Sequence, residues 1–392
     1  MKKRFHLKLR IFAVILTIIL TSSCFIHSIF AQESSATPTN AELNLNCQSA
    51  VLMEATSGQI LYEQNPDLAL PPASVTKIMT LLLVMEAIDS GKITLSDMVS
   101  TSEYAASMGG SQVYLKVGER MSVEDMLKSV VISSANDAAV ALAEFVSGDI
   151  DSFVRRMNER ATELGMTSTH FENVTGLDDT AEHHLTSAKD IAIMSRALIA
   201  HPTILKYSSI WMDTIRDGAF GLTNTNRLVR FYPGATGLKT GSTAKAGFCV
   251  SVTAERGGLS LICVIMGSES RDERNATAAK LLDWGFANFA SFQEEGTELE
   301  DIKVKGGIQL SCPVRYEGFC TVIPKEKLGK IEKKIYVEDS VSAPVKTGDC
   351  VGKVEYFLDG NLIGAVDIVA QTDVQKISFG GVFRRLISKI LF

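Results

Sequence analysis

The sequence predicts an α+β fold, in which one antiparallel sheet is covered by helices and is followed by a small all-β domain and a terminal amphipathic helix. Strand-like segments stand near both ends of the first 290 residues and flank a helical middle, which is the order expected when distant strands join in one antiparallel sheet. From about residue 298 the pattern changes to short alternating strands between Gly, Pro and Asp turns. The last eleven residues combine apolar and basic positions at a helical period.

The N-terminus has the features of a secretory signal. Five basic residues precede an apolar run over 11–20, and a small-residue cleavage site follows at Ala31. The apolar run is too short for a permanent membrane span. Cys24 raises the alternative of a lipoprotein signal, but Thr21 stands three residues before it, where a leucine-like residue is usual. We therefore expect residues 1–31 to be removed and the chain to be exported.

The net charge and the cysteine positions limit the kinds of ligand and cross-link that the chain can have. Loss of the five basic residues changes the formal charge from −6 to −11, and no basic stripe with interleaved aromatics remains, which argues against nucleic acid. No cysteine has metal-site spacing with histidine, and export permits disulfides. Cys312 and Cys320 bracket a predicted hairpin and are the favoured pair. Cys249 and Cys263 flank a turn almost symmetrically and are either a second pair or packed free thiols.

The elements of the first domain follow from periodicity and turn residues. In chain order they are a strand over 46–53, its hairpin partner over 60–62, a helix over 74–89 ended by Gly91, further helices to about residue 202, two or three strands over 239–268 and a helix over 276–289. The interior of the first helix, residues 78–85, is apolar on all sides, so we expect this helix to be buried at the centre of the domain.

The start of that helix carries a serine and a lysine three residues apart. This spacing puts Ser74 and Lys77 on the same helix face. If that face lines a dry cleft, burial lets the lysine lose its charge and take the proton of the serine hydroxyl. Alone the pattern is weak, because Ser-x-x-Lys also marks an ordinary helix start with an exposed lysine.

Two further motifs follow in order. Ser-Ala-Asn at 134–136 lies between apolar segments, which predicts a buried loop between helices whose polar side chains face a cavity. Lys-Thr-Gly at 239–241 precedes a predicted strand over 247–252. Ser-x-x-Lys, Ser-Asp-Asn and Lys-Thr-Gly together form the motif set of penicillin-recognising serine enzymes, and this chain has Ala135 at the middle position of the second motif.

With these motifs, residues 45–290 resemble the low-molecular-weight penicillin-binding proteins, the serine-type D-alanyl-D-alanine carboxypeptidases, and the remainder to 392 resembles them more loosely. Segments 164–173, 184–190 and 224–228 add to the resemblance. It implies a penicillin-binding-protein/β-lactamase-like fold and a reaction without a metal or other cofactor. It also implies a β-rich domain over 298–372 that carries no catalytic residues and serves as a spacer or partner contact.

The resemblance implies a role for each motif residue. Ser74 is the nucleophile that attacks the carbonyl between the two D-alanines of a peptidoglycan stem peptide, and Lys77 is its base. Ser134 relays a proton to the leaving D-alanine, and Asn136 hydrogen-bonds the substrate amide. A β-lactam, which mimics the same dipeptide, would acylate Ser74 and leave slowly.

The third motif is implied to bind the substrate's terminal carboxylate through Lys239 and Thr240, while Gly241 leaves room for substrate beside the strand. The backbone N–H groups of Ser74 and Ser242 are implied to form the oxyanion hole.

Three further candidate residues lie outside the three motifs. Arg274 aligns with a family arginine near the substrate carboxylate. An ordinary surface arginine is the alternative, because Arg271 stands one helical turn away. His170 and His184 are interpreted as structural, since polar loop residues usually serve local hydrogen bonds.

Two alternative functions are considered. A class A β-lactamase shares the first and third motifs, but normally carries Asp where this chain has Ala135, and it has a Glu-x-x-Leu-Asn loop that is missing between 155 and 185. A non-catalytic, membrane-bound peptidoglycan-binding protein is the second alternative, and the intact motifs argue against it.

The C-terminal segment, 376–392, is predicted to form an amphipathic helix. Its apolar face is Val382, Phe383, Leu386, Ile387, Ile390 and Leu391, and its polar face is Arg384, Arg385, Ser388 and Lys389. Such a helix is too short to span a bilayer but suits an anionic membrane surface. We therefore expect peripheral attachment to the outer face of the cytoplasmic membrane; docking of the helix on its own protein is the alternative.

Overall fold

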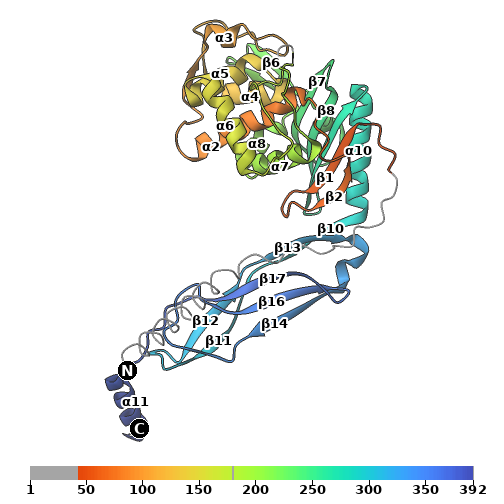
Figure 1. Ribbon diagram of the computed structural model, residues 1–392. Coiled ribbons are helices and arrows are strands. Elements are labelled where there is room, and N and C mark those ends of the chain that lie inside the picture. The colour runs from red at the N-terminus through yellow and green to blue at the C-terminus, as the bar shows by residue number, and fades with distance from the viewer. Residues whose placement is uncertain (1–42, 179–180, 392) are drawn as a thin grey trace, which may run out of the picture. The chain divides into compact units, whose positions relative to one another are not determined.

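The computed structural model describes residues 43–178 and 181–391 (Figure 1). The expected signal segment, with Cys24 and Ala31, lies outside the described residues. Within the described part of the chain, no helix combines the length and the apolar character that a membrane crossing needs.

A five-stranded antiparallel sheet organises the first domain, and this confirms the predicted α+β class. The strands, in spatial order, are β2 (Ile60–Gln64), β1 (Ser49–Glu54), β9 (Leu259–Ser268), β8 (Gly247–Arg256) and β7 (Ala235–Thr243). Strand β1 pairs with β9 with Val51 opposite Val264, so segments some 210 residues apart are neighbours in the sheet. The predicted hairpin partner of the first strand and the predicted strands over 239–268 are also confirmed.

Helices cover both faces of this sheet (Figure 1). One face packs against a helical group, namely α2 (Lys77–Asp89), α4 (Val123–Ser133), α5 (Asn136–Ser147), α6 (Ile150–Glu163), α7 (Ala188–Ile199) and α8 (Pro202–Ser208). The other face packs against α10 (Arg271–Asn288) and α9 (Leu228–Phe231). Because side chains alternate along a strand, Val51 joins the first core and Leu52 the second.

Helix α2 is the buried central helix that the sequence predicts, since every residue over 77–85 is buried. Its start differs from the prediction. Ser74 lies in a 3-10 turn, η1 (Ala73–Thr76), because Ala73 has a left-handed φ of +48° and the chain enters the turn outside helical geometry. The closing helix α10 also begins earlier than predicted, at Arg271, because the Ser270 side chain accepts a hydrogen bond from the Glu273 N–H and caps it.

The C-terminal domain is all-β, as predicted. A six-stranded sheet comprises β14 (Ile331–Val337), β16 (Cys350–Leu358), β17 (Asn361–Ala370), β12 (Ser311–Tyr316), β11 (Thr297–Lys305) and β15 (Ser340–Ser342), and a two-stranded sheet comprises β10 (Phe289–Glu294) and β13 (Phe319–Pro324). The alternating pattern over 308–310 does not form a strand: Gly306, with φ +68°, turns the chain, and β12 begins at Ser311. The smaller elements are β3 (Met98–Ser100), β4 (Arg120–Ser122), β5 (Met212–Ile215), β6 (Phe220–Thr223), α3 (Glu103–Ala106), η2 (Lys325–Lys330) and the terminal α11 (Phe379–Leu391).

The favoured disulfide is contradicted, because all six cysteines of the described residues are free. Cys312 stands on β12 opposite Ile302, whereas Cys320 stands on β13, in the separate two-stranded sheet. The second candidate pair does not face across a hairpin either, since Cys249 belongs to the core on one side of the sheet and Cys263 to the core on the other.

Candidate active site

The three motifs meet in one pocket of about 560 Å³. The 3-10 turn η1 brings Ser74, the loop between α4 and α5 brings Ser134, and β7 brings Thr240. Gly241, Ser242 and Arg274 line the same pocket. Segments that are far apart in the chain therefore place these predicted site residues around a single cavity, with Lys77 and Lys239 buried beneath it.

Ser74 and Lys77, the predicted nucleophile and base, lie within hydrogen-bond distance of each other. The Lys77 Nζ lies 3.0 Å from the Ser74 Oγ and also donates a hydrogen bond of 2.9 Å to the Thr175 carbonyl oxygen. The lysine is fully buried, and burial together with the positive charge of Lys239 holds the pKa of Lys77 well below its usual range, against the opposing effect of Asp137. When the neutral Lys77 amine donates one N–H to the Thr175 carbonyl oxygen, its nitrogen lone pair can point at the Ser74 hydroxyl.

The Ser-Ala-Asn motif adds two buried polar atoms. Ser134 adopts a left-handed conformation, φ +62°, where α4 ends, and Asn136 opens α5. The Asn136 Nδ2 donates to the Gly109 carbonyl oxygen at 2.7 Å. Among the described residues, the Ser134 Oγ and the Asn136 Oδ1 are buried without a hydrogen-bond partner. Buried polar atoms are normally paired, so these two are the atoms that a bound substrate would satisfy.

The Lys-Thr-Gly strand supplies a buried cation. Lys239 is 1% exposed, and its Nζ donates to the Thr240 carbonyl oxygen at 2.9 Å. Burial and the positive charge of Arg274 lower the pKa of Lys239 to about 7. A carboxylate bound nearby would favour the charged form again. The Thr240 hydroxyl donates to the Thr225 hydroxyl at 2.8 Å, which orients it in the pocket.

The structure gives a reason for glycine at position 241 that differs from the predicted one. A Cβ at this position would lie 2.8 Å from the Ser74 nitrogen and 2.8 Å from the Pro72 carbonyl oxygen. The glycine therefore lets β7 pass directly against the nucleophile turn. The close approach sets the strand beside the backbone N–H of Ser74, where the oxyanion hole is expected.

Arg274 is not an ordinary surface arginine, because only 2% of it is exposed. Its guanidinium donates to the Cys249 carbonyl oxygen at 3.3 Å and to the Asn275 side chain at 2.9 Å, both of which are neutral. Burial and the charge of Arg271 lower its pKa to about 10. A buried cation with neutral partners beside Lys239 is suited to a substrate carboxylate.

Sequence reasoning missed the segment behind the nucleophile. Residues 174–176 contact successive positions of the η1–α2 start: the Val174 carbonyl oxygen accepts from the Thr80 hydroxyl at 2.7 Å, in addition to the bond from Lys77 to the Thr175 carbonyl oxygen. A Cβ on Gly176 would lie 1.8 Å from the Ala73 carbonyl oxygen, so the two backbones touch. No motif could have identified these contacts, because they use backbone carbonyls.

His184 belongs to this backing segment. Its Nδ1 accepts from the Glu172 N–H at 3.0 Å, so its Nε2 carries the proton and donates to the Thr76 hydroxyl at 2.8 Å. Burial lowers the pKa of His184 to about 4, which keeps the ring neutral. The histidine is structural, as predicted, but it supports the turn that carries the nucleophile. His170 is exposed and does not line the pocket.

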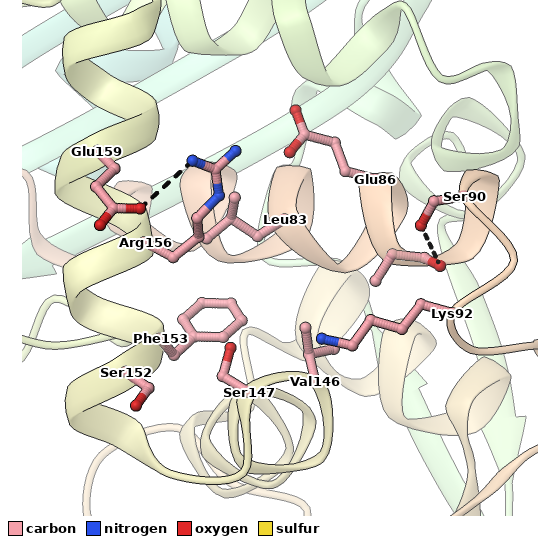
Figure 2. Close-up of a pocket in the computed structure, with 11 residues that line it drawn as sticks. Leu83, Glu86, Ser90, Lys92, Val146, Ser147, Ser152, Phe153, Arg156 and Glu159 are labelled. Atoms are coloured by element: carbon pink, nitrogen blue, oxygen red, sulfur yellow. Dashed lines mark hydrogen bonds and ion pairs between the residues drawn. The ribbon is translucent and has the colours of Figure 1, made fainter.

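A second pocket, of about 570 Å³, lies at the far end of α2 (Figure 2). Leu83 and Phe153 contribute apolar surface, and Lys92 and Arg156 contribute positive charge. It contains none of the predicted site residues. Within the described residues, no group of three His, Cys, Asp or Glu side chains is placed to hold a metal ion.

Comparison with known proteins agrees with this geometry. Residues 34–270 match the family model described as D-alanyl-D-alanine carboxypeptidase, and residues 290–376 match the model of the penicillin-binding protein 5 C-terminal domain. The D-alanyl-D-alanine carboxypeptidase DacF of Bacillus subtilis is 41% identical over 362 residues, which cover 91% of this chain and 92% of that protein.

Solved structures give the same result. Penicillin-binding protein 5 from Haemophilus influenzae superposes with a TM-score of 0.74 at 34% identity, covering 85% of this chain and 98% of that chain. Penicillin-binding protein D2 from Listeria monocytogenes, in an ampicillin-bound form, superposes with a TM-score of 0.57 at 34% identity, covering 62% of this chain and 99% of that chain.

Proposed function

The chain belongs to the D-alanyl-D-alanine carboxypeptidase family, and we propose that it removes the terminal D-alanine from peptidoglycan stem peptides with Ser74 as the nucleophile of an acyl-enzyme. The observation that carries the assignment of the nucleophile is the fully buried Lys77 amine, which lies 3.0 Å from the Ser74 hydroxyl under the pocket. A buried lysine with a lowered pKa is the base that such a hydroxyl needs near neutral pH.

Acylation begins when the neutral Lys77 amine takes the proton of Ser74 as the serine oxygen attacks the carbonyl carbon between the two D-alanines. The oxyanion that forms accepts hydrogen bonds from the backbone N–H groups of Ser74 and Ser242. Loss of one such donor typically costs about 100- to 1,000-fold in rate. The Ser134 hydroxyl then passes a proton to the leaving amine and regains one from the protonated Lys77 amine, and the C–N bond breaks to release D-alanine.

Substrate orientation follows from the buried cations. The terminal carboxylate lies at the Thr240 hydroxyl between Lys239 and Arg274, and the free Asn136 Oδ1 accepts from a substrate amide N–H. Water hydrolyses the acyl-enzyme in the second half of the reaction and restores the Ser74 hydroxyl.

β-Lactams are the expected inhibitors. The Listeria relatives were solved in ampicillin-bound and cefotaxime-bound forms, and the same pocket residues support covalent capture on Ser74 here. The family match and the missing Glu-x-x-Leu-Asn loop disfavour the class A β-lactamase alternative. The buried base beside Ser74 disfavours a purely non-catalytic binding protein.

Peripheral membrane attachment through α11 is a further part of the proposal. Its apolar side chains remain exposed, among them Phe383 at 59%, Leu386 at 55% and Ile390 at 81%, so the apolar face is not used for docking on this protein. Arg385 makes the contacts with the domain, by donating to the Ile308 carbonyl oxygen at 2.7 Å and the Gly307 carbonyl oxygen at 3.3 Å. An exposed apolar face on a basic helix suits an anionic bilayer surface at the outer face of the membrane.

The membrane proposal predicts that the full chain sediments with vesicles rich in phosphatidylglycerol and less with phosphatidylcholine vesicles. Leu386→Glu combined with Ile390→Glu should abolish this sedimentation. Sedimentation that survives the double substitution would contradict attachment through α11.

The nucleophile is tested by labelling the full chain with a fluorescent penicillin and locating the adduct by peptide mass spectrometry. The adduct is expected on Ser74. Ser74→Ala should abolish labelling, whereas Ser90→Ala, at the opposite end of α2, should label normally. An adduct on another residue would overturn the assignment.

A further inference from the structure

The active-site pocket extends beyond the residues assigned to the terminal carboxylate. Arg227, Arg271, Trp211 and Phe231 also line it. Its volume of about 560 Å³ lies in the range of pockets that hold drug-sized ligands. The proposed binding of a leaving D-alanine uses Lys239, Thr240 and Arg274, and it assigns no substrate group to Arg227 and Arg271 of the same pocket.

The extension is positively charged. Arg227 and Arg271 are exposed at the pocket, and no ion pair joins either guanidinium to a carboxylate among residues 43–178 and 181–391. Asp272, which acts on Arg274, is the nearby acidic group that offsets part of this charge. The concentration of cations stands out in a chain whose formal net charge is −6.

The cations of the pocket form a series in which each charge acts on the next group. The charge of Lys239 lowers the pKa of Lys77, and the charge of Arg274 lowers that of Lys239. The charges of Arg271 and Arg227 in turn lower the pKa of Arg274. Arg227 and Arg271 line the same pocket as Ser74 and Arg274, so a substrate whose terminal carboxylate lies at Lys239 and Arg274 shares this pocket with two further positive groups.

We propose that this extension is a leaving-group subsite for D-amino acids with a negatively charged side chain, in which Arg227 and Arg271 bind the second carboxylate. The proposal rests on the proposed carboxypeptidase function, because the carboxylate at Arg274 fixes where the side chain of the leaving residue lies. One α-carbon carries both the α-carboxylate and this side chain. A second carboxylate on a two- or three-carbon side chain therefore reaches the next cations in the series.

Aromatic side chains bound the outer part of the subsite. The rings of Trp211 and Phe231 stand edge to face with centroids 6.1 Å apart, and Phe231 is 70% exposed. The Arg230 guanidinium lies 5.9 Å from both ring centroids, which adds positive charge at the rim. These positive charges repel a leaving residue with a cationic side chain, so the subsite favours anionic over cationic leaving residues.

The test uses four peptides that end Lys-D-Ala-X, where X is D-alanine, D-glutamate, D-glutamine or D-lysine. Release of X by the full chain in detergent is measured as kcat/KM. D-glutamate and D-glutamine have nearly the same shape, so the ratio of their kcat/KM values reports the effect of charge alone. We expect D-glutamate to be released at least about fivefold faster than D-glutamine, which corresponds to one well-formed exposed ion pair, and D-lysine to be the slowest.

Variants assign the effect to the two arginines. In Arg227→Gln with Arg271→Gln, the ratio of D-glutamate to D-glutamine should fall to about one, while D-alanine release and penicillin labelling stay within about twofold. Arg155→Gln with Lys325→Gln, which also removes two positive charges but from exposed positions outside the pocket, should keep the wild-type ratio and so controls for net charge.

The outcomes separate the two proposals. A wild-type ratio near one with normal D-alanine release overturns the subsite alone, as does a ratio that survives the double substitution. Failure of the wild-type chain to release D-alanine overturns the proposed function and the subsite with it.

Discussion

Substitution of Gly241 by alanine tests how closely the strand and the nucleophile turn must approach. The added Cβ would lie 2.8 Å from the Ser74 nitrogen, 2.8 Å from the Pro72 carbonyl oxygen and 2.9 Å from the Val75 nitrogen. Ordinary contact begins near 3.4 Å, so β7 and the turn must separate by about 0.6 Å. All three atoms belong to the backbone, so no side-chain rotation relieves the clash.

The magnitude follows from two effects. Overpacking of this kind costs about 1–3 kcal/mol of stability. The separation also moves the backbone N–H of Ser74 away from that of Ser242, and catalytic groups tolerate only about 0.5 Å of misplacement. Because one oxyanion donor is worth about 100- to 1,000-fold, we expect the acylation rate of Gly241→Ala to fall by about 100-fold.

The assay is the second-order rate constant for labelling by a fluorescent penicillin, together with the midpoint of thermal unfolding. Gly221→Ala is the matched control, because this strand glycine has no atom within 4 Å of its Cβ position and its φ is not in the left-handed range. It should label at the wild-type rate. Normal labelling by Gly241→Ala, or an equal loss in Gly221→Ala, would refute the reasoning.

Three further predictions concern charge and thiols. The positive charge of Lys239 lowers the pKa of Lys77, so this pKa should rise in Lys239→Gln. The acid limb of the pH profile of the acylation rate should then move to higher pH. An unchanged midpoint of this limb would count against Lys77 as the base. His184 has a pKa of about 4 when folded, whereas an unperturbed histidine has a pKa of 6.5, so its contribution to stability is complete above pH 6.5 and is lost as the pH falls towards 4. Urea unfolding should show a loss of about 3 kcal/mol over this window that is missing in His184→Gln; equal pH slopes would contradict the buried neutral ring. The six cysteines of residues 43–391 should all react with a thiol reagent in denaturant without prior reduction, and fewer reactive thiols among them, located by peptide mass spectrometry, would reveal a disulfide.

The sequence predicted the fold class because its periodicities are strong. The all-apolar interior of α2 required burial, and the short alternating segments after residue 298 required a β domain. Element starts were less predictable, because they depend on single backbone conformations and caps, such as the left-handed Ala73 and the Ser270 cap of α10. The disulfide expectation failed for Cys312 and Cys320 because sequence proximity does not say that two strands belong to different sheets.

The site was predictable where motifs name side chains. Ser74 and Lys77 stand together as their spacing indicates, and Ser134 lines the same pocket. The backing segment was not predictable, since its contacts use the Thr175 and Val174 carbonyls, and any residue type supplies a carbonyl. The reason for the glycine of the third motif also needed coordinates, because only they show which backbone approaches it.

The most direct test of the account is release of free D-alanine from a peptide ending Lys-D-Ala-D-Ala by the full chain in detergent, beside Ser74→Ala. The account predicts release by the wild-type chain that vanishes in the variant, with both proteins showing the same unfolding midpoint. Release that persists in Ser74→Ala would contradict the assigned nucleophile, and no release from a folded wild-type chain would contradict the carboxypeptidase function itself.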